Sequence, residues 1–244
     1  MRLNQFLARA AGGSRREADG WIRDGRVTVN GAPPEGMGVD VDPERDRVAL
    51  DGHTVSLPDR FRYLAYHKPP GLLVSRRGQG GKRTIFDALG ERARGLHAAG
   101  RLDFESEGLL LLTDDGDLSE ALLHPRTEAL RRYRVWVRPV PDPDALRRLE
   151  SGTVVEGVPV APRRVTIEGV ERGAGVLLVD LMEGRKREVR LLAAAAGLDV
   201  DRLLRVQFGP IHLGPLRPGA LRPLEPGEIA ALRALAFRGP SARC

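Results

Sequence analysis

Residues 100 to 116 read Gly-Arg-Leu-Asp-Phe-Glu-Ser-Glu-Gly-Leu-Leu-Leu-Leu-Thr-Asp-Asp-Gly. The four consecutive leucines, Leu109 to Leu112, predict a strand that is buried on both faces. Such a strand fixes the loop before it, and that loop carries Asp103. A carboxylate held there beside Arg101 is suited to nucleophilic or general-base work. An Arg-x-Asp sequence in a loop is more often a structural ion pair, so these residues alone leave both interpretations open.

The chain around this stretch is predicted to form an α+β domain with a mostly antiparallel sheet flanked by helices. Apolar strands alternate with short helical segments, and the strands are expected at Tyr63 to Tyr66, Leu109 to Leu112 and Val176 to Leu181. We expect this domain to cover 61–237. Before it, 57–60 is predicted to be a linker, and after it 238–244, rich in Arg, Gly, Pro and Ser, is predicted to be a flexible tail.

The first 56 residues predict a separate small domain of two helices and a small sheet. One helix is indicated by Leu3, Phe6, Leu7 and Ala10, and another by the capping-box sequence of 14–17 followed by Ala18, Trp21 and Ile22. Strands are expected at 26–31 and 47–50. This stretch, 1–56, resembles the S-four RNA-binding domain. The resemblance and the helix-start position imply four phosphate contacts, at Arg15, Arg16, Arg23 and Arg26.

Composition narrows the class of partner and the chemistry. A net charge of +6 and a pI near 10.2 favour a polyanion such as nucleic acid, although genomic base composition explains the arginine excess equally well. The single cysteine, Cys244, excludes an internal disulfide, and the five histidines have no metal-ligand spacing. No apolar run is long enough to span a bilayer, and acidic residues near the start argue against a targeting peptide. We therefore expect a cytoplasmic protein without a bound metal.

The 100–116 stretch closely resembles the signature of the pseudouridine synthases that modify bacterial ribosomal RNA, the group in which an S-four domain precedes the catalytic domain. The signature is Gly-Arg-Leu-Asp, a short variable stretch, Ser or Thr, then Gly-Leu-Leu-Leu-Leu-Thr and Asp-Gly. The resemblance extends from Tyr63 to about Leu235. It implies that Asp103 is the essential aspartate and that Arg101 helps to open the RNA stack.

Two further segments agree with this resemblance. Lys68-Pro69-Pro70-Gly71 follows an apolar strand and matches the family's opening turn. In Leu130 to Val135, strand alternation puts Tyr133 on an apolar face with Val135 and Val137. A lone tyrosine there would most often be core packing, but the motif implies that Tyr133 stacks on the target uracil.

A basic segment, Glu183 to Arg190, is predicted to begin a helix. Lys186, Arg187 and Arg190 would share one helical side and contact RNA or the site, and the resemblance implies that Arg190 pairs with Asp103. Three departures from the family pattern are Arg131 for lysine, Glu188 for glutamine, and Leu191-Leu192 for a basic-methionine pair. They put the RNA contacts in question more than the activity.

The function predicted is conversion of one uridine in ribosomal RNA to pseudouridine by a catalytic set of Asp103, Tyr133 and Arg190, with large-subunit RNA preferred over small-subunit RNA. Ribosomal RNA or a pre-ribosomal particle is the expected partner of a monomer, with no membrane and no cofactor. Three alternative functions remain: a non-catalytic RNA-binding or assembly factor, a synthase acting on transfer RNA, and an NTPase. Gly78 to Lys82 suggests a phosphate loop, but Arg76 and Arg83 stand where its first glycine and its Ser or Thr belong. The sequence leaves open whether Asp103 attacks the sugar or removes a ribose proton.

Overall fold

The computed structural model describes residues 1–238 and divides the chain into two compact units. The first unit comprises 1–62 with 89–97, and the second comprises 63–88 with the chain from 98 onward. No sequence pattern indicated that 89–97 would group with the first unit. Of the predicted tail, 239–244 lies outside the described residues.

The first unit contains the two predicted helices and a three-stranded antiparallel sheet of order β1-β2-β3. A capping box of Ser14 and Glu17 starts the second helix, as the sequence predicts, because each side chain accepts a hydrogen bond from the other residue's backbone N–H. Apolar side chains from both helices and the first two strands form its core. The elements are α1 (Leu3–Ala10), α2 (Arg15–Arg23), β1 (Val27–Val29), β2 (Val48–Leu50) and β3 (His53–Thr54).

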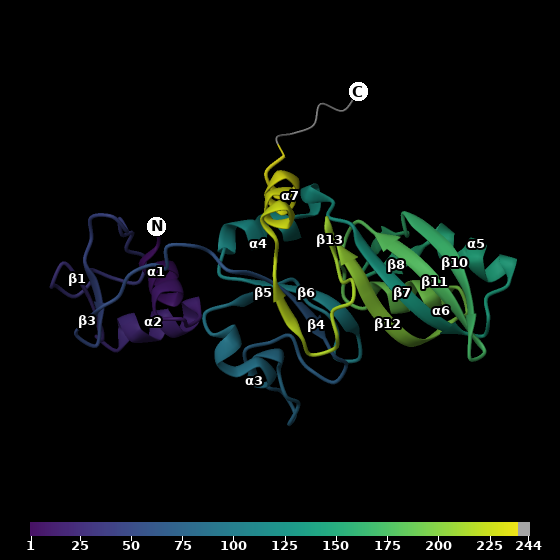
Figure 1. The fold of residues 1–244 in the computed structure, drawn as a ribbon, viewed down its shortest axis with the longest axis horizontal. Helices are drawn as coiled ribbons and strands as arrows, with labels where there is room; N and C mark the ends of the chain where they lie inside the picture. The colour runs from purple at the N-terminus through teal and green to yellow at the C-terminus, as the bar shows by residue number, and fades with distance from the viewer. Residues whose placement is uncertain (239–244) are drawn as a thin grey trace. The chain divides into compact units, whose positions relative to one another are not determined.

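The second unit is built on a nine-stranded sheet in the described chain, with the order β10-β11-β7-β12-β6-β4-β14 (Figure 1). In addition, β13 pairs with β12 and β5 pairs with β6. The β12–β6 pairing is parallel, whereas the other ladders with a stated register are antiparallel, which confirms the predicted mostly antiparallel sheet. The strands are β4 (Tyr63–Lys68), β5 (His97–Ala99), β6 (Glu107–Thr113), β7 (Arg131–Arg138), β10 (Arg164–Glu171), β11 (Ala174–Leu181), β12 (Asp199–Phe208), β13 (Ile211–His212) and β14 (Leu221–Pro223).

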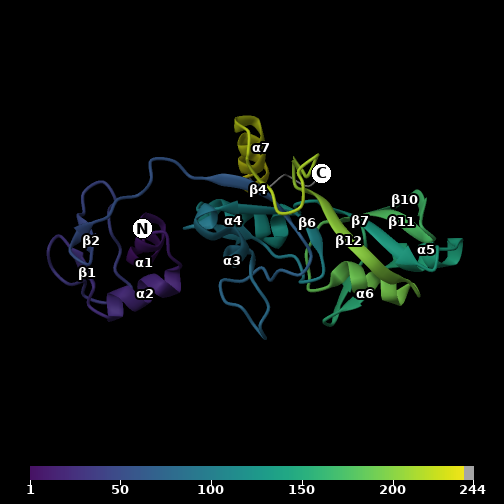
Figure 2. The ribbon, with the colours of Figure 1, turned by 60° about the horizontal axis from the view of Figure 1, so that its bottom comes forward.

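The predicted leucine strand is β6, and every residue of it is buried. Leu109 and Leu111 belong to a core cluster that also contains side chains of α4 and α7, while Leu110 and Leu112 are buried on the opposite face. The helices α4 (Gly116–Leu123) and α7 (Pro226–Ala236) lie side by side in both views of the unit (Figures 1 and 2). Burial on both faces therefore fixes the position of the strand that follows the Asp103 loop.

The described chain also contains further helices, two 3₁₀ turns and a separate two-stranded sheet; of these, η1 lies within 89–97, which groups with the first unit. The helices α5 (Pro143–Ser151) and α6 (Glu188–Ala195) pack against each other, and α6 also packs on β12 (Figure 2). The rest are α3 (Ile85–Leu89), the two 3₁₀ turns η1 (Gly90–Ala93) and η2 (Pro125–Thr127), and the two-stranded sheet of β8 (Thr153–Val155) and β9 (Val158–Val160).

The prediction that Lys186, Arg187 and Arg190 share one side of a helix is wrong. The helix begins at Glu188, and Arg187 is its N-cap residue in the left-handed conformation, with φ of 56°. The Glu188 carboxylate accepts a hydrogen bond from the Arg185 backbone N–H at 2.8 Å, which fixes the turn before the helix. Lys186 and Arg187 therefore project from a turn, and only Arg190 projects from the helix.

The parallel contact between β6 and β12 depends on a glycine. Gly108 is the register partner of Arg205 and has φ of +110°, a conformation that side-chain-bearing residues rarely adopt. A Cβ atom at this position would overlap the backbone of Arg205. The close approach of the two strands therefore requires glycine.

We predict that Gly108→Ala lowers the free energy of unfolding by about 2–5 kcal/mol, because it adds backbone strain to a backbone clash. Gly227→Ala is the matched control in the same unit. Gly227 lies in α7 at negative φ with open space around its Cα, so its replacement should raise stability by about 0.5–1 kcal/mol. Chemical denaturation measures the free energy of unfolding of both variants. Equal values for the two variants would contradict the conclusion that position 108 requires glycine.

Candidate active site

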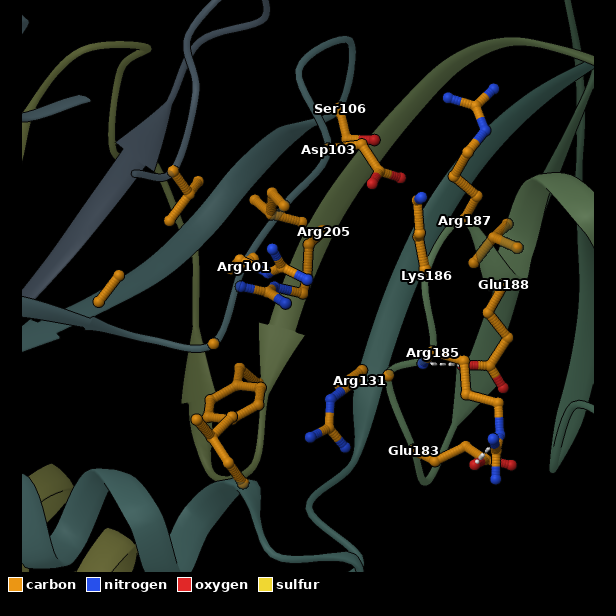
Figure 3. Close-up of a pocket in the computed structure, with 18 of the residues that line it drawn as sticks. Arg101, Asp103, Ser106, Arg131, Glu183, Arg185, Lys186, Arg187, Glu188 and Arg205 are labelled. Atoms are coloured by element: carbon orange, nitrogen blue, oxygen red, sulfur yellow. Dashed lines mark hydrogen bonds and ion pairs between the residues drawn. The ribbon is translucent and has the colours of Figure 1, made fainter. Parts of the chain in front are cut away.

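A cavity of about 850 Å³ opens in the second unit where segments far apart in sequence come together (Figure 3). Its lining includes Arg101 and Asp103 from the loop before β6, Tyr133 from β7, and Lys186 and Arg187 from the turn before α6. The volume is typical of a ligand site. Five residues that the sequence assigned to the site thus line one space.

Asp103 is half-buried, and its carboxylate is turned toward the cavity (Figure 3). Its backbone carbonyl accepts a hydrogen bond from Ser106 N at 3.1 Å, which closes the loop into a turn. In the described chain, no side chain lies within ion-pair or hydrogen-bonding distance of the Asp103 carboxylate. The carboxylate is therefore available to a bound molecule.

The loop is anchored by a buried lysine. Lys68, at the end of β4, is 0 % exposed, and its ammonium group donates to the carbonyl oxygens of Phe104 at 3.3 Å and Ser106 at 2.7 Å. The Gly71 N–H also donates to the Phe104 carbonyl, at 2.8 Å. The Lys-Pro-Pro-Gly turn thus holds the chain on the C-terminal side of Asp103 by backbone-directed hydrogen bonds.

Burial lowers the pKa of Lys68 to about 8 from an ordinary value of 10.5, and the charges of Asp103 and Glu107 oppose that shift. Between pH 8 and 10.5 the unfolded chain therefore binds a proton that the folded protein does not bind. Stability due to this group consequently rises with pH across that window and is lowest below pH 8, where a charged amine is buried.

We predict that wild type gains stability relative to Lys68→Met as the pH rises from about 8 to 10.5. The free energies of unfolding of both proteins, measured by denaturation across this range, give the difference. Lys82→Met removes one positive charge from an exposed position and serves as the control. A difference between wild type and Lys68→Met that stays flat or shrinks with rising pH would refute the lowered pKa.

Tyr133 is buried on the same side of β7 as Val135 and Val137, as alternation predicts. Its ring borders the cavity, and its register partner on β12 is Arg205. Arg205 is in turn the partner of Gly108 on β6, so the cavity floor is formed by β7 and β12, and the loop that leads into β6 lines the same cavity. Tyr133 is held as a wall of the cavity.

The expected Arg190–Asp103 ion pair is not present within the described residues. Arg190 Nη1 instead donates to the Val200 carbonyl at 3.1 Å, and Nη2 lies 3.8 Å from Glu105 Oε2. Arg187 Nη1 also lies 3.7 Å from the same oxygen. Arg190 is directed toward Glu105 because the helix begins later than predicted, so it contacts the loop of Asp103 and not the carboxylate itself.

Charged side chains also line the cavity, and two of them, Arg131 and Glu188, stand out in the sequence only as departures from the family pattern. Glu188 is buried, and burial raises the pKa of its carboxyl group. Arg131 is buried too; its Nη1 donates to the carbonyls of Ala129 and Met182 at 2.7 and 3.1 Å. Burial lowers the pKa of Arg131. Arg185 Nε pairs with Glu183 at 2.7 Å.

In the first unit, the four predicted phosphate contacts differ in their partners. All four side chains are exposed. Arg26 is held by Asp51 in a two-bond ion pair with distances of 2.8 and 2.6 Å. Within residues 1–238, Arg15, Arg16 and Arg23 have no carboxylate partner, so their charges are more available to a phosphate than that of Arg26.

Sequence reasoning assigned no role to Lys68 or Arg205. Both are basic residues next to apolar ones within strands, Lys68 at the end of Tyr63–Lys68 and Arg205 after two leucines of Asp199–Phe208. A charged residue that interrupts a buried strand is a signal that could have found them, since such groups are rarely buried without a partner.

The family of the chain follows from comparison of its sequence. Residues 62–195 match the family described as RNA pseudouridylate synthase, and residues 1–33 match the S4 domain. The chain therefore belongs to the RNA pseudouridine synthase family and is an isomerase with an N-terminal S4 domain. The fold class and the family expected from the sequence are confirmed.

Named relatives cover most of the chain. An "Uncharacterized RNA pseudouridine synthase" of Aquifex aeolicus is 39% identical over 95% of this chain and 93% of its own length. Proteins named "Ribosomal large subunit pseudouridine synthase B" are 42% identical in Yersinia pestis, over 87% of this chain and 68% of that protein, and 33% identical in Bacillus subtilis, over 99% of each. A crystal structure of a pseudouridylate synthase matches with a TM-score of 0.64 and 29% identity, covering 95% of this chain and 99% of that one.

Among the helices of residues 1–238, none combines the length and the apolar character that crossing a membrane requires.

Proposed function

We propose that this enzyme isomerises one uridine of large-subunit ribosomal RNA to pseudouridine, with Asp103 as the catalytic carboxylate. The observation that carries the proposal is the cavity in which Asp103, Tyr133 and three basic side chains meet, although they come from three distant segments of the chain. The choice of large-subunit RNA is supported by the names of the relatives in Yersinia pestis and Bacillus subtilis.

The reaction breaks the bond between ribose C1′ and uracil N1, turns the base, and joins C1′ to C5. The base must leave the RNA stack and stay bound throughout. In the proposal, Asp103 acts on the nucleotide, Tyr133 stacks on the flipped uracil, and Arg101 occupies the vacated space. Lys186 and Arg187, both exposed beside the cavity, bind phosphates of the RNA.

Arg190 completes the proposed set as a positioning residue. It joins the Val200 carbonyl of β12 to Glu105, two residues after Asp103, and so contacts the loop that carries the catalytic carboxylate. Because Arg190 does not form an ion pair with Asp103, the Asp103 carboxylate stays available to the substrate.

The protein is further proposed to act in the cytoplasm as a monomer on ribosomal RNA or a pre-ribosomal particle, without a cofactor. Residues 1–56 would anchor the RNA and 61–237 would perform catalysis. The exposed, carboxylate-free arginines of α2 support the anchoring role, since each cation placed on a phosphate releases counterions.

Asp103→Asn should abolish pseudouridine formation while RNA binding stays within a few-fold of wild type. The change keeps the shape of the side chain and removes its charge, and loss of a reacting group costs roughly 10⁴-fold or more. Pseudouridines are mapped in ribosomal RNA from cells that lack the protein and carry either variant. Asp117→Asn, an exposed carboxylate on α4 away from the cavity, should restore the modification fully.

Wild-type turnover by Asp103→Asn would remove the catalytic assignment. Loss of a modification from small-subunit or transfer RNA, with large-subunit RNA unchanged, would instead correct the substrate.

The anchoring role predicts that replacing Arg15 and Arg16 together by Gln weakens binding to a large-subunit RNA fragment. The slope of log binding constant against log salt concentration should become shallower by about one to two. Arg26→Gln is the comparison, because Asp51 already compensates its charge, and it should have the smaller effect. Affinity is measured by fluorescence anisotropy at several salt concentrations. Equal binding by wild type and the double variant would exclude the anchoring role.

A further inference from the structure

Three buried side-chain atoms around the cavity have no hydrogen-bond partner within the described residues. They are Ser106 Oγ, Glu188 Oε1 and Arg205 Nη2. Buried polar atoms are nearly always paired, so an unpaired one at the wall of a cavity marks a place for a bound molecule. Arg205 is the cation among the three, and it lies on β12, the strand between β7 and β6.

Arg205 is held by one hydrogen bond to β6 and lies close to the ring of Phe208. It is 3 % exposed, and its Nε donates to the Leu109 carbonyl of β6 at 2.7 Å. Its guanidinium carbon lies 5.3 Å from the centre of the Phe208 ring, and the β12–β7 register shifts just after Arg205. One side of the guanidinium group is thus fixed by the strand of the catalytic loop, while Nη2 remains unpaired.

No carboxylate forms an ion pair with Arg205 in the described chain, although its guanidinium group is always charged. Its charge is near those of Lys68 and Arg131, whose pKa values it helps to lower. A buried cation among other cations is costly unless an acceptor arrives from outside. The cavity floor is therefore suited to a group that carries negative charge.

We propose that Arg205 donates a hydrogen bond from Nη2 to an exocyclic carbonyl oxygen of the target uracil, an inference that rests on the proposed function. When the bond from C1′ to N1 breaks, its electron pair leaves with the base and spreads over N1, O2 and O4. When C1′ bonds to C5, the C5 proton is released and N1 takes up a proton, so no outside oxidant or reductant is needed. Arg205 stabilises the negative charge between these two events.

A base carbonyl fits this position better than an RNA phosphate does. Arg101, Lys186 and Arg187 are exposed and can meet a hydrated phosphate, whereas Arg205 is buried and offers a single unpaired nitrogen. A uracil stacked on Tyr133 would bring the edge of its ring toward the neighbouring strand, where Arg205 is the register partner of Tyr133.

The test compares uridine, 2-thiouridine and 4-thiouridine at the target position in single-turnover reactions with saturating enzyme. Sulfur accepts hydrogen bonds weakly, so wild type should lose roughly 10-fold in rate on one of the two thio substrates, and that substrate identifies O2 or O4 as the acceptor. The rate of Arg205→Met on uridine should be roughly 10²-fold below that of wild type. Because the variant lacks the donor, replacing uridine by that thio substrate should slow it by less than about a further 3-fold. Arg202→Met is the matched control: Arg202 is on the same strand, paired with Glu107 and outside the cavity lining, and its variant should keep the wild-type thio effect.

The proposal would be overturned if sulfur substitution in the base slowed wild type and Arg205→Met by the same factor. It would also be overturned if the variant changed the rate loss caused by phosphorothioates in the RNA backbone and not the loss caused by sulfur in the base. Where Arg205→Met does not fold, Arg205→Lys keeps the charge while displacing the donor, and it too should show a reduced thio effect. Absence of wild-type turnover on uridine would refute the proposed function, whereas wild-type turnover without coupling would refute this inference alone.

Discussion

At Gly108 the backbones of β6 and β12 approach so closely that no side chain fits between them. This contact places β12 between β6 and β7 in the sheet and brings Tyr133, Arg205 and the Asp103 loop to one cavity. The chemistry of the site thus depends on a backbone contact at a residue that has no side chain to react. The buried leucines on either side of β6 keep the strand rigid at that point.

The parts of the fold set by local pattern could be predicted from the sequence. The four leucines are apolar on both strand faces, the alternation at Tyr133 defines one face, and the Ser14–Glu17 capping box starts a helix. The motif at 100–116 indicated the family, and the family is confirmed. In each case the information lies within a few neighbouring residues.

Other parts depend on contacts between distant segments, and local pattern does not encode them. A shift of the start of α6 to Glu188 redirects Arg190 toward Glu105, 85 residues earlier in the chain by residue number. The roles of Lys68 and Arg205 depend on which carbonyl groups the fold brings beside them, and those carbonyls belong to the loop before β6 for Lys68 and to β6 for Arg205. Side-chain identity alone therefore could not indicate what these cations hold.

The insertion of β12 between β6 and β7 also orders events during translation. Both β6 and β7 leave the ribosome before the strand that joins them, because β12 spans Asp199–Phe208. Until that segment emerges, β6 and β7 each have one unpaired edge in the nascent chain, and such edges are prone to wrong pairing. The cavity floor can form only when most of the chain has been made, so a truncated translation product ending before β12 would display the signature motif and yet lack a site.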